Sequence, residues 1–327
     1  MGSSSESSPS ASPEFLEVFR AHADRDGTMG FARFMALALY HPEVGYYRRP
    51  RQRVGYGEGT DFYTSATSGV VFGELVSSAC RQLLVTADRD PGQHTFVEIG
   101  AEPEHSVLQG VRHPFQAVRT LRISDALKIE GDCVVFSNEL FDAQPFTRTV
   151  FREGAWHEIG VTAQGGRLKE VMLPCQRDRL GVEGYHFDEP LSATELASQI
   201  AGQAWRGLFV ALDYGKTFGE LISETPAGTA RAYHRHTQSN ELLARPGEQD
   251  LTCHICWDWL SEVLAGKGFH PPTLESQEAF FIRRAGDYIA LASQEDAKTL
   301  SRRKLALMQL LHPSHLGQKF QVLHATR

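Results

Sequence analysis

Three polar residues directly follow one strongly apolar stretch of the chain. Asn138, Glu139 and Asp142 come after the apolar run 133–136, and Pro145 closes the segment. At the carboxyl end of a buried strand, a carboxylate and an amide can hold an amine or guanidinium nucleophile, orient its lone pair and accept its proton. The alternative is structural, because Asn138 can cap a helix that Glu139 opens. We favour the chemical interpretation and take these three residues as catalytic candidates.

A second candidate site follows the apolar strand predicted at 95–99. Glu98 and Gly100 begin a turn of the kind that lets a nucleotide or S-adenosylmethionine approach backbone N–H groups. The turn continues with Ala101-Glu102-Pro103-Glu104-His105 instead of further glycines. The proline removes an N–H donor, and the two glutamates would repel the carboxylate of an amino-acid-like cofactor.

The remaining motifs predict neither a metal centre nor a common hydrolytic site. Cys253 and Cys256 form a pair without the further ligands that a zinc site needs, and we interpret them as the start of a helix. His234 and His236 alternate with arginines and predict a polar loop or a surface strand. The sequence contains no GxSxG, HExxH or phosphate-binding-loop motif. We therefore expect no metal.

The composition argues against some partners and compartments. The 327 residues are 41% hydrophobic and 22% charged, and the net charge of -7 would repel a nucleic acid backbone. No apolar run is long enough to span a membrane, so no membrane insertion is expected. The cysteines are scattered and odd in number, which favours a reducing compartment and predicts a cytoplasmic protein. Nothing in the composition predicts an oligomeric state.

The candidate residues need a scaffold that brings strand ends together. Apolar stretches at 95–99, 132–136 and 208–212 alternate with helical segments, which is typical of a parallel sheet. Each stretch ends in polar or glycine residues, and the carboxyl ends of parallel strands share the edge at which ligands bind. The sequence therefore predicts an α/β domain over 91–327, with antiparallel hairpins inserted around 147–173.

The flanking segments predict other structures. Residues 1–13 are rich in serine and are expected to form a disordered tail. Residues 14–90 predict a helical N-terminal subdomain, which includes a helix over 70–84. Towards the C-terminus, 251–264 and 301–311 predict helices and 320–323 predicts a late strand.

Short motifs extend over nearly the whole chain after residue 14. They are FARFM at 31–35, HPEVGYY at 41–47, GTDFYTS at 59–65, VFGE at 71–74, NELFDA at 138–143, WHE at 156–158, DYG at 213–215, GTARAY at 228–233, PGEQDLT at 246–252 and HPSHLG at 312–317. Together they resemble the MidA-like S-adenosylmethionine-dependent methyltransferases, relatives of the mitochondrial complex I assembly arginine methyltransferase.

The resemblance implies a class I methyltransferase (Rossmann-like) sheet with an added helical N-terminal part. It also implies S-adenosylmethionine as cofactor and methylation of protein arginine as activity. Cofactor binding is then assigned to Asp61, Thr64, Glu98 and Gly100, beside the catalytic candidates Asn138, Glu139 and Asp142. The partner would be a protein, and by family resemblance a respiratory-complex subunit.

The length of one segment predicts a departure from that fold. Only 33 residues, 101–133, lie between Gly100 and Val134. A complete class I order needs three helices and two strands there, and at mean lengths of about 11 and about 5 residues these need about 43. At least one βα unit is therefore missing. We expect loss of the second strand with its helix, which leaves 115–121 as the sole internal strand and removes the acidic residue that normally binds the cofactor ribose.

Different classes of function remain open at this point. The leading hypothesis is methyl transfer from S-adenosylmethionine on the Gly100 side to a nitrogen held by Glu139, Asp142 and Asn138. The rival is a catalytically inactive relative that keeps a protein-binding cleft and serves as an assembly or interaction factor. The glutamates after Gly100 and the short segment favour that rival. A third, weaker hypothesis is a different small ligand whose cationic group suits those glutamates.

Overall fold

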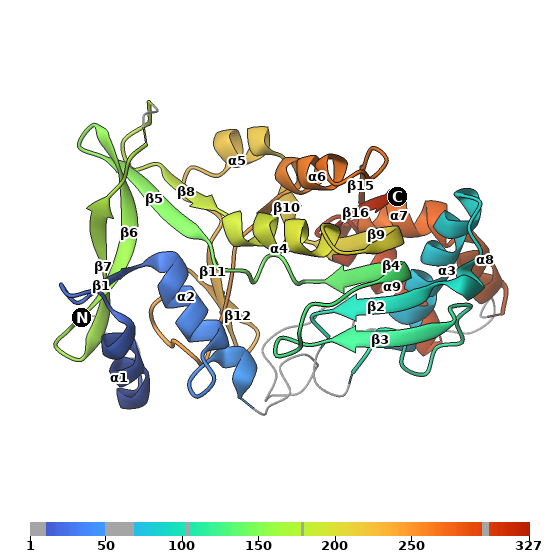
Figure 1. Ribbon diagram of the computed structural model, residues 1–327, viewed down its shortest axis with the longest axis horizontal. Coiled ribbons are helices and arrows are strands. Elements are labelled where there is room, and N and C mark those ends of the chain that lie inside the picture. The colour runs from blue at the N-terminus through green and yellow to red at the C-terminus, as the bar shows by residue number, and fades with distance from the viewer. Residues whose placement is uncertain (1–10, 50–68, 102–104, 178–179, 296–300) are drawn as a thin grey trace, which may run out of the picture. The chain divides into compact units, whose positions relative to one another are not determined.

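The computed structural model describes residues 11–49, 69–101, 105–177, 180–295 and 301–327 (Figure 1). All but the last three residues of the predicted tail lie outside these ranges. Contacts within the chain define two units. Unit 1 comprises residues 1–62, 143–193 and 219–254, and unit 2 comprises residues 63–142, 194–218 and 255–327.

Unit 2 is built on a mostly parallel sheet with strand order β15-β16-β9-β4-β2-β3. The strands are β2 (Thr95–Ile99), β3 (Ala117–Leu121), β4 (Gly131–Asn138), β9 (Trp205–Asp213), β15 (Thr273–Ser276) and β16 (Gln321–Thr326). The strands β3, β2, β4 and β9 run parallel, and β16 pairs antiparallel with both β9 and β15. Figure 1 shows the arrowheads of β3, β2 and β4 at the same edge.

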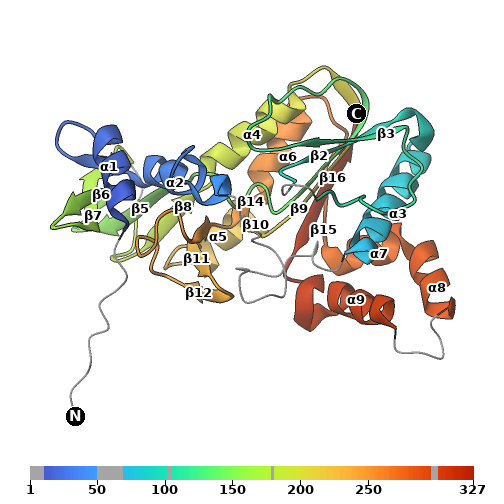
Figure 2. The ribbon, with the colours of Figure 1, turned by 90° about the horizontal axis from the view of Figure 1, so that it is seen from below.

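Helices cover both faces of this sheet. They are α3 (Val70–Thr86), α4 (Leu191–Ala201), α6 (Trp257–Gly266), α7 (Gln277–Arg284), α8 (Gly286–Glu295) and α9 (Arg302–Leu311). Figure 2 shows α6 on one side of the sheet and α3 and α7 on the other. Phe96, Phe136 and Val210 pack with α3 and α7 in one buried core. Burial on both faces explains why these strands are continuous apolar runs in the sequence.

Unit 1 contains the antiparallel hairpins predicted around 147–173, together with the N-terminal helices. Its strands are β1 (Thr28–Gly30), β5 (Thr147–Arg152), β6 (Ala155–Gln164), β7 (Arg167–Pro174), β8 (His186–Glu189), β11 (Arg231–His234), β12 (Thr237–Ser239) and β13 (Asp250–Thr252). Its helices are α1 (Pro13–His22), α2 (Phe31–Tyr40) and most of α5 (Phe218–Glu224). The Ser12 side chain accepts from the Phe15 N–H and fixes the start of α1.

The packing of α3 differs from the sequence-based domain boundaries. The sequence groups 70–84 with the helical N-terminal subdomain, but α3 belongs to unit 2 and buries Phe72, Leu75 and Leu84 in the core of the parallel sheet. The helices α1 and α2 instead share a core with β6 and β13. Apolar periodicity identifies a helix, but it does not identify the surface on which the helix packs.

The helix predicted over 251–264 is wrong in its first part. Residues up to Thr252 belong to β13, Ile255–Cys256 form β14, and α6 begins only at Trp257. β14 pairs in parallel with β10 (Gly215–Lys216), and β13 pairs with β11. A short apolar run is compatible with a strand or a helix. Here the residues form strands because they pair with β10 and β11, which are distant in the sequence. Every helix within the described ranges is too short or too polar for a membrane crossing.

The segment between β2 and β4 holds fewer helices and strands than a complete class I sheet, as the 33-residue length of 101–133 predicts. Among its described residues, β3 is the only strand and no helix occurs. β3 pairs directly with β2, so the sheet closes up where a βα unit is missing. Its outer edge carries no further strand in the described part of the chain.

A side chain at Gly207 in β9 would collide with the neighbouring strand. Gly207 has a φ of +127°, and an added Cβ would lie 2.2 Å from the carbonyl oxygen of Cys133. We expect Gly207→Ala to lower the free energy of unfolding by about 2 kcal/mol or more, because both the backbone strain and the clash are unavoidable. Urea unfolding tests this against Gly266→Ala in α6, where nothing lies within 4 Å and the change should be neutral or slightly stabilising. Equal unfolding midpoints for the two variants would contradict the prediction.

Candidate functional site

The carboxyl ends of β2, β4 and β9 meet at one edge of the sheet, as the sequence predicts. In the strand register Ile99 lies opposite Ser137, and Asn138 lies opposite Leu212. The Glu139 N–H then donates to the Leu212 carbonyl at 3.0 Å, which continues the ladder past the end of β4. Open α/β sheets bind their ligands at this edge.

Gly100 brings the turn after β2 against the segment after β4. Its φ is +84°, and an added Cβ would lie 2.9 Å from Cδ1 of Leu140. Its N–H donates to the Leu121 carbonyl at 2.8 Å, so β3 is tied into the same turn. Only glycine satisfies both the left-handed backbone and the close approach. The two candidate segments therefore touch each other.

The segment after β4 forms a turn and not a helix, so the capping alternative for Asn138 is not realised. Glu139 has a φ of +51°, a left-handed conformation that is uncommon outside glycine and that cannot open a helix. The Asn138 side-chain amide donates to Oε1 of Glu139 at 3.0 Å. Both side chains are partly exposed, whereas Asp142 is only 4% exposed.

A fully buried aspartate at the end of β9 organises this turn. Oδ2 of Asp213 accepts from the backbone N–H groups of Phe141 at 2.8 Å and Asp142 at 3.4 Å. Oδ1 accepts from the Tyr214 N–H at 2.8 Å. Burial raises the pKa of Asp213 to about 7, and the backbone donors oppose that rise. The sequence signal was a polar residue directly after the apolar run 208–212, but the run did not reveal which backbone groups it would bind.

Glu98 supports the turn after β2 from within. Its carboxylate is buried, and its Oε2 accepts from the Ser106 hydroxyl at 2.7 Å and the Val107 N–H at 2.9 Å. Burial raises the pKa of Glu98, against the effect of these two donors. The Glu98 carboxylate thus ties residues 106 and 107 to the end of β2.

Two predicted site residues and part of the turn after Gly100 lie outside the described ranges. Asp61 and Thr64 lie outside the described residues, as does the stretch Glu102-Pro103-Glu104. Cys253 and Cys256 are buried free thiols. No cluster of histidine, cysteine and acidic residues suited to a metal occurs among the residues that the structure describes.

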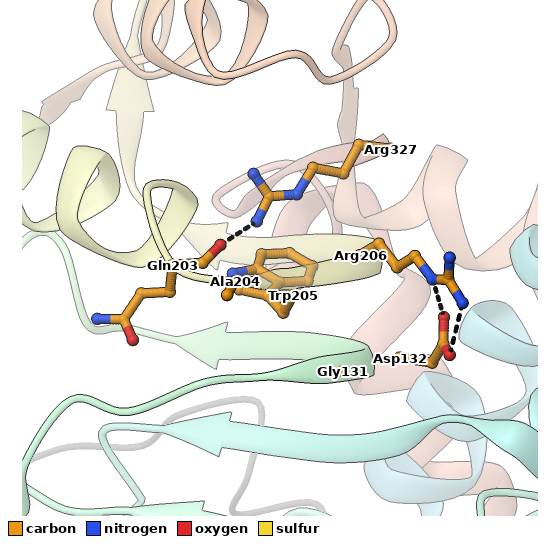
Figure 3. A pocket seen from close by; sticks show the side chains of 7 residues that line it. All are labelled: Gly131, Asp132, Gln203, Ala204, Trp205, Arg206 and Arg327. Carbon is orange, nitrogen blue, oxygen red and sulfur yellow. Dashed lines mark hydrogen bonds and ion pairs between the residues drawn. The ribbon is translucent and has the colours of Figure 1, made fainter.

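A hollow of about 440 Å³ lies at the opposite ends of β4 and β9 (Figure 3). It is lined by Gly131, Asp132, Gln203, Ala204, Trp205, Arg206 and Arg327. Gly131 and Trp205 are the first residues of their strands, so this hollow is at the amino ends and not at the ligand-binding edge. Arg206 donates to both oxygens of Asp132, at 2.7 and 3.3 Å, and closes one side of the hollow. None of the predicted site residues lines it.

Comparison with known proteins agrees with the geometry. Residues 103–273 match the model of a family described as S-adenosyl-L-methionine-dependent methyltransferases. The chain is 23% identical to the protein arginine methyltransferase NDUFAF7, mitochondrial, of Mus musculus, over 90% of this chain and 80% of the relative. It is 21% identical to the Danio rerio protein of the same name, over 96% and 87%.

A solved structure confirms the fold. A protein from Burkholderia thailandensis, crystallised bound to S-adenosyl-homocysteine, superimposes with a TM-score of 0.83 at 23% identity. The match covers 96% of this chain and 92% of that one. The class I methyltransferase-type sheet and the MidA-like resemblance expected from the sequence are therefore confirmed.

We expect Asp213→Asn to destabilise the protein by about 1–3 kcal/mol, because one acceptor oxygen becomes an NH₂ group that faces a backbone N–H. It should also flatten the pH dependence of stability. The folded-state pKa of Asp213 is raised to about 7, so between about pH 4 and that value the unfolded chain loses a proton that the folded chain keeps. The free energy of unfolding should therefore fall as the pH rises through this window.

Urea unfolding at a series of pH values measures both effects. Asp287→Asn is the matched control, because that carboxylate is 96% exposed. A constant difference between the wild-type protein and Asp213→Asn at every pH would show that Asp213 does not titrate as described.

Proposed function

The chain belongs to the family of S-adenosyl-L-methionine-dependent methyltransferases, and we propose that it methylates a nitrogen of a protein, specifically an arginine side chain. The observation that carries this proposal is the meeting of the Gly100 turn and the Asn138–Asp142 turn at the ligand-binding edge of the sheet. The names of the curated relatives support the choice of acceptor, because they are protein arginine methyltransferases.

The residues at this edge fit the cofactor. The Ser137 hydroxyl and Oδ1 of Asn138 are buried and have no hydrogen-bond partner within the described ranges. Such atoms cost stability unless a donor reaches them, and the cofactor offers an ammonium group and ribose hydroxyls. We propose that it binds between these atoms and the Gly100 turn. When bound, it supplies an electrophilic methyl group on a sulfonium.

The acceptor side is assigned to Glu139 and Asn138. The Glu139 carboxylate, oriented by the Asn138 amide at 3.0 Å, suits a planar guanidinium and can neutralise the charge that the acceptor nitrogen gains. The nitrogen lone pair would form the new bond to the methyl carbon as the carbon–sulfur bond breaks and leaves its electron pair on the departing thioether sulfur. The proton that the nitrogen gives up would pass to a carboxylate or to water. We propose a positioning role for Asp142, because its side chain is buried and its N–H is held by Asp213.

A second candidate function is an inactive relative that acts as an interaction factor. The absence of a βα unit next to β2 favours it, since β3 alone forms that edge of the sheet in the described part of the chain. The compartment in which the protein acts also stays a prediction. The sequence favours the cytoplasm, the named relatives are mitochondrial, and a respiratory-complex subunit as partner rests on the resemblance alone.

Calorimetric titration separates these functions. We expect S-adenosylmethionine and S-adenosylhomocysteine to bind the purified protein, because the strand-end edge and its two buried acceptors are in place. Absence of binding for both at millimolar ligand would exclude methyl transfer and favour the inactive relative.

Substituting the acceptor-side carboxylate tests the catalytic assignment. Glu139→Gln should keep cofactor binding and reduce methyl transfer to an arginine peptide by about 100-fold or more, since the neutral amide neither pairs with the guanidinium nor accepts a proton. Glu195→Gln on α4 is the matched control, because Glu195 is exposed. Transfer at the wild-type rate in Glu139→Gln would remove Glu139 from the catalytic role.

A further inference from the structure

An arginine in unit 1 lies between two aromatic rings and a carboxylate. The guanidinium carbon of Arg177 is 5.4 Å from the ring centroid of Trp156 and 5.4 Å from that of Phe187. Its NH2 group forms an ion pair with Oε1 of Glu189. Trp156 and Phe187 are buried, while the side chains of Arg177 and Glu189 are 16% and 17% exposed. The side chains of the ion pair are thus mostly covered but keep some access to solvent.

The three groups around the guanidinium belong to one face of one sheet. Trp156 in β6 lies opposite Phe151 of β5, while Phe187 and Glu189 in β8 lie opposite Thr149 and Thr147 of β5. Positions 147, 149 and 151 alternate along one strand and point to the same face. Trp156 also packs edge-on against Phe151, with 5.5 Å between the ring centroids, and this contact holds the indole in place. Trp156, Phe187 and Glu189 therefore form a receptor on regular strands, which we call the arginine cage.

The occupant comes from outside the strands that form the cage. Arg177 follows β7 and lies in neither a helix nor a strand. The backbone at Gly181 rests on the Phe151 ring, where an added Cβ would lie 2.4 Å from the ring. Leu180 and Val182 on either side of Gly181 are 102% and 72% exposed, the two highest values among the large apolar side chains that the structure describes. A partner that reaches the cage would therefore meet apolar surface beside it.

The chemistry of the cage selects a planar cation. Two aromatic faces attract a cation through their quadrupoles, and a slot between two rings suits the flat guanidinium better than the rounder ammonium of lysine. The carboxylate at the rim can accept from its N–H groups. We propose that the arginine cage binds the guanidinium group of an arginine side chain on a protein partner, and that Arg177 occupies it as an internal competitor. This proposal goes beyond methyl transfer and does not depend on it, because the cage residues are distinct from those at the sheet edge.

The test is binding of a short glycine peptide with one central arginine to the full chain without cofactor. Vacating the cage by Arg177→Ala should tighten binding about tenfold or more, because the internal competitor is removed. The same peptide with citrulline, which has nearly the same shape but no charge, should not bind. Adding Glu189→Gln to Arg177→Ala should abolish the gain. Arg167→Ala, at an exposed arginine of the β6–β7 hairpin, should leave the wild-type affinity unchanged.

Circular dichroism shows whether Arg177→Ala keeps the fold. Should it unfold, Arg177→Lys keeps a cation in place but loses the flat fork, so it should compete less well and give an affinity above that of the wild type. Equal peptide affinity in the wild-type protein and in whichever of these variants folds would overturn the proposal and leave Arg177 as a structural staple. Equal binding of the citrulline peptide would overturn it too. The acceptor side proposed at Glu139 also offers a carboxylate to an arginine peptide, so the same affinities are measured in the Glu139→Gln background. A gain from Arg177→Ala that persists in that background belongs to the cage, so failure of the proposed catalytic function and failure of the cage are read separately.

Discussion

The candidate site depends on the Asp213 carboxylate at the end of β9. It lies in the core and accepts from backbone N–H groups of the turn that follows β4. A buried carboxylate is costly unless its oxygens are satisfied, so the turn and the aspartate stabilise each other. This arrangement holds Glu139 in its left-handed conformation and presses Leu140 against Gly100. Without it, the residues proposed to bind the acceptor would have no fixed relation to the cofactor edge.

In unit 1 a second buried aspartate accepts hydrogen bonds from the backbone of a loop. The buried Asp188 accepts from the N–H groups of Thr229 at 2.7 Å and Ala230 at 2.8 Å, and from Nε of Arg148 at 2.8 Å. A side chain at Gly228 would place its Cβ 2.4 Å from the Asp188 carboxylate, so glycine is required there. Gly228, Thr229 and Ala230 belong to the GTARAY motif at 228–233 that contributes to the family resemblance. The motif is thereby explained as a loop clamped by an aspartate, whatever else it binds.

The amino-acid sequence predicts the fold correctly where burial leaves a direct pattern. The strands at 95–99, 132–136 and 208–212 are covered on both faces, so their apolar runs are continuous and their polar ends mark one edge of the sheet. The shortened segment before Val134 also followed from chain length alone. Reasoning failed where a distant partner decides the outcome. Residues 251–252 and 255–256 form strands because β11 and β10 lie beside them, and the role of Asp213 depends on a turn 72 residues earlier. The sequence around Arg177 does not predict the cage, because its two aromatic neighbours come from separate strands.

We propose that the carboxyl ends of β2 and β4, and not the hollow at the amino ends of β4 and β9, form the cofactor-binding edge. Amide hydrogen exchange with and without S-adenosylhomocysteine tests it directly, since exchange slows where a ligand orders or covers the backbone. We expect added protection in peptides that cover 97–101 and 137–142, with no change around Asp132 and Arg206. Protection confined to Asp132 and Arg206 would place the ligand at the amino ends of the strands and contradict the proposed site.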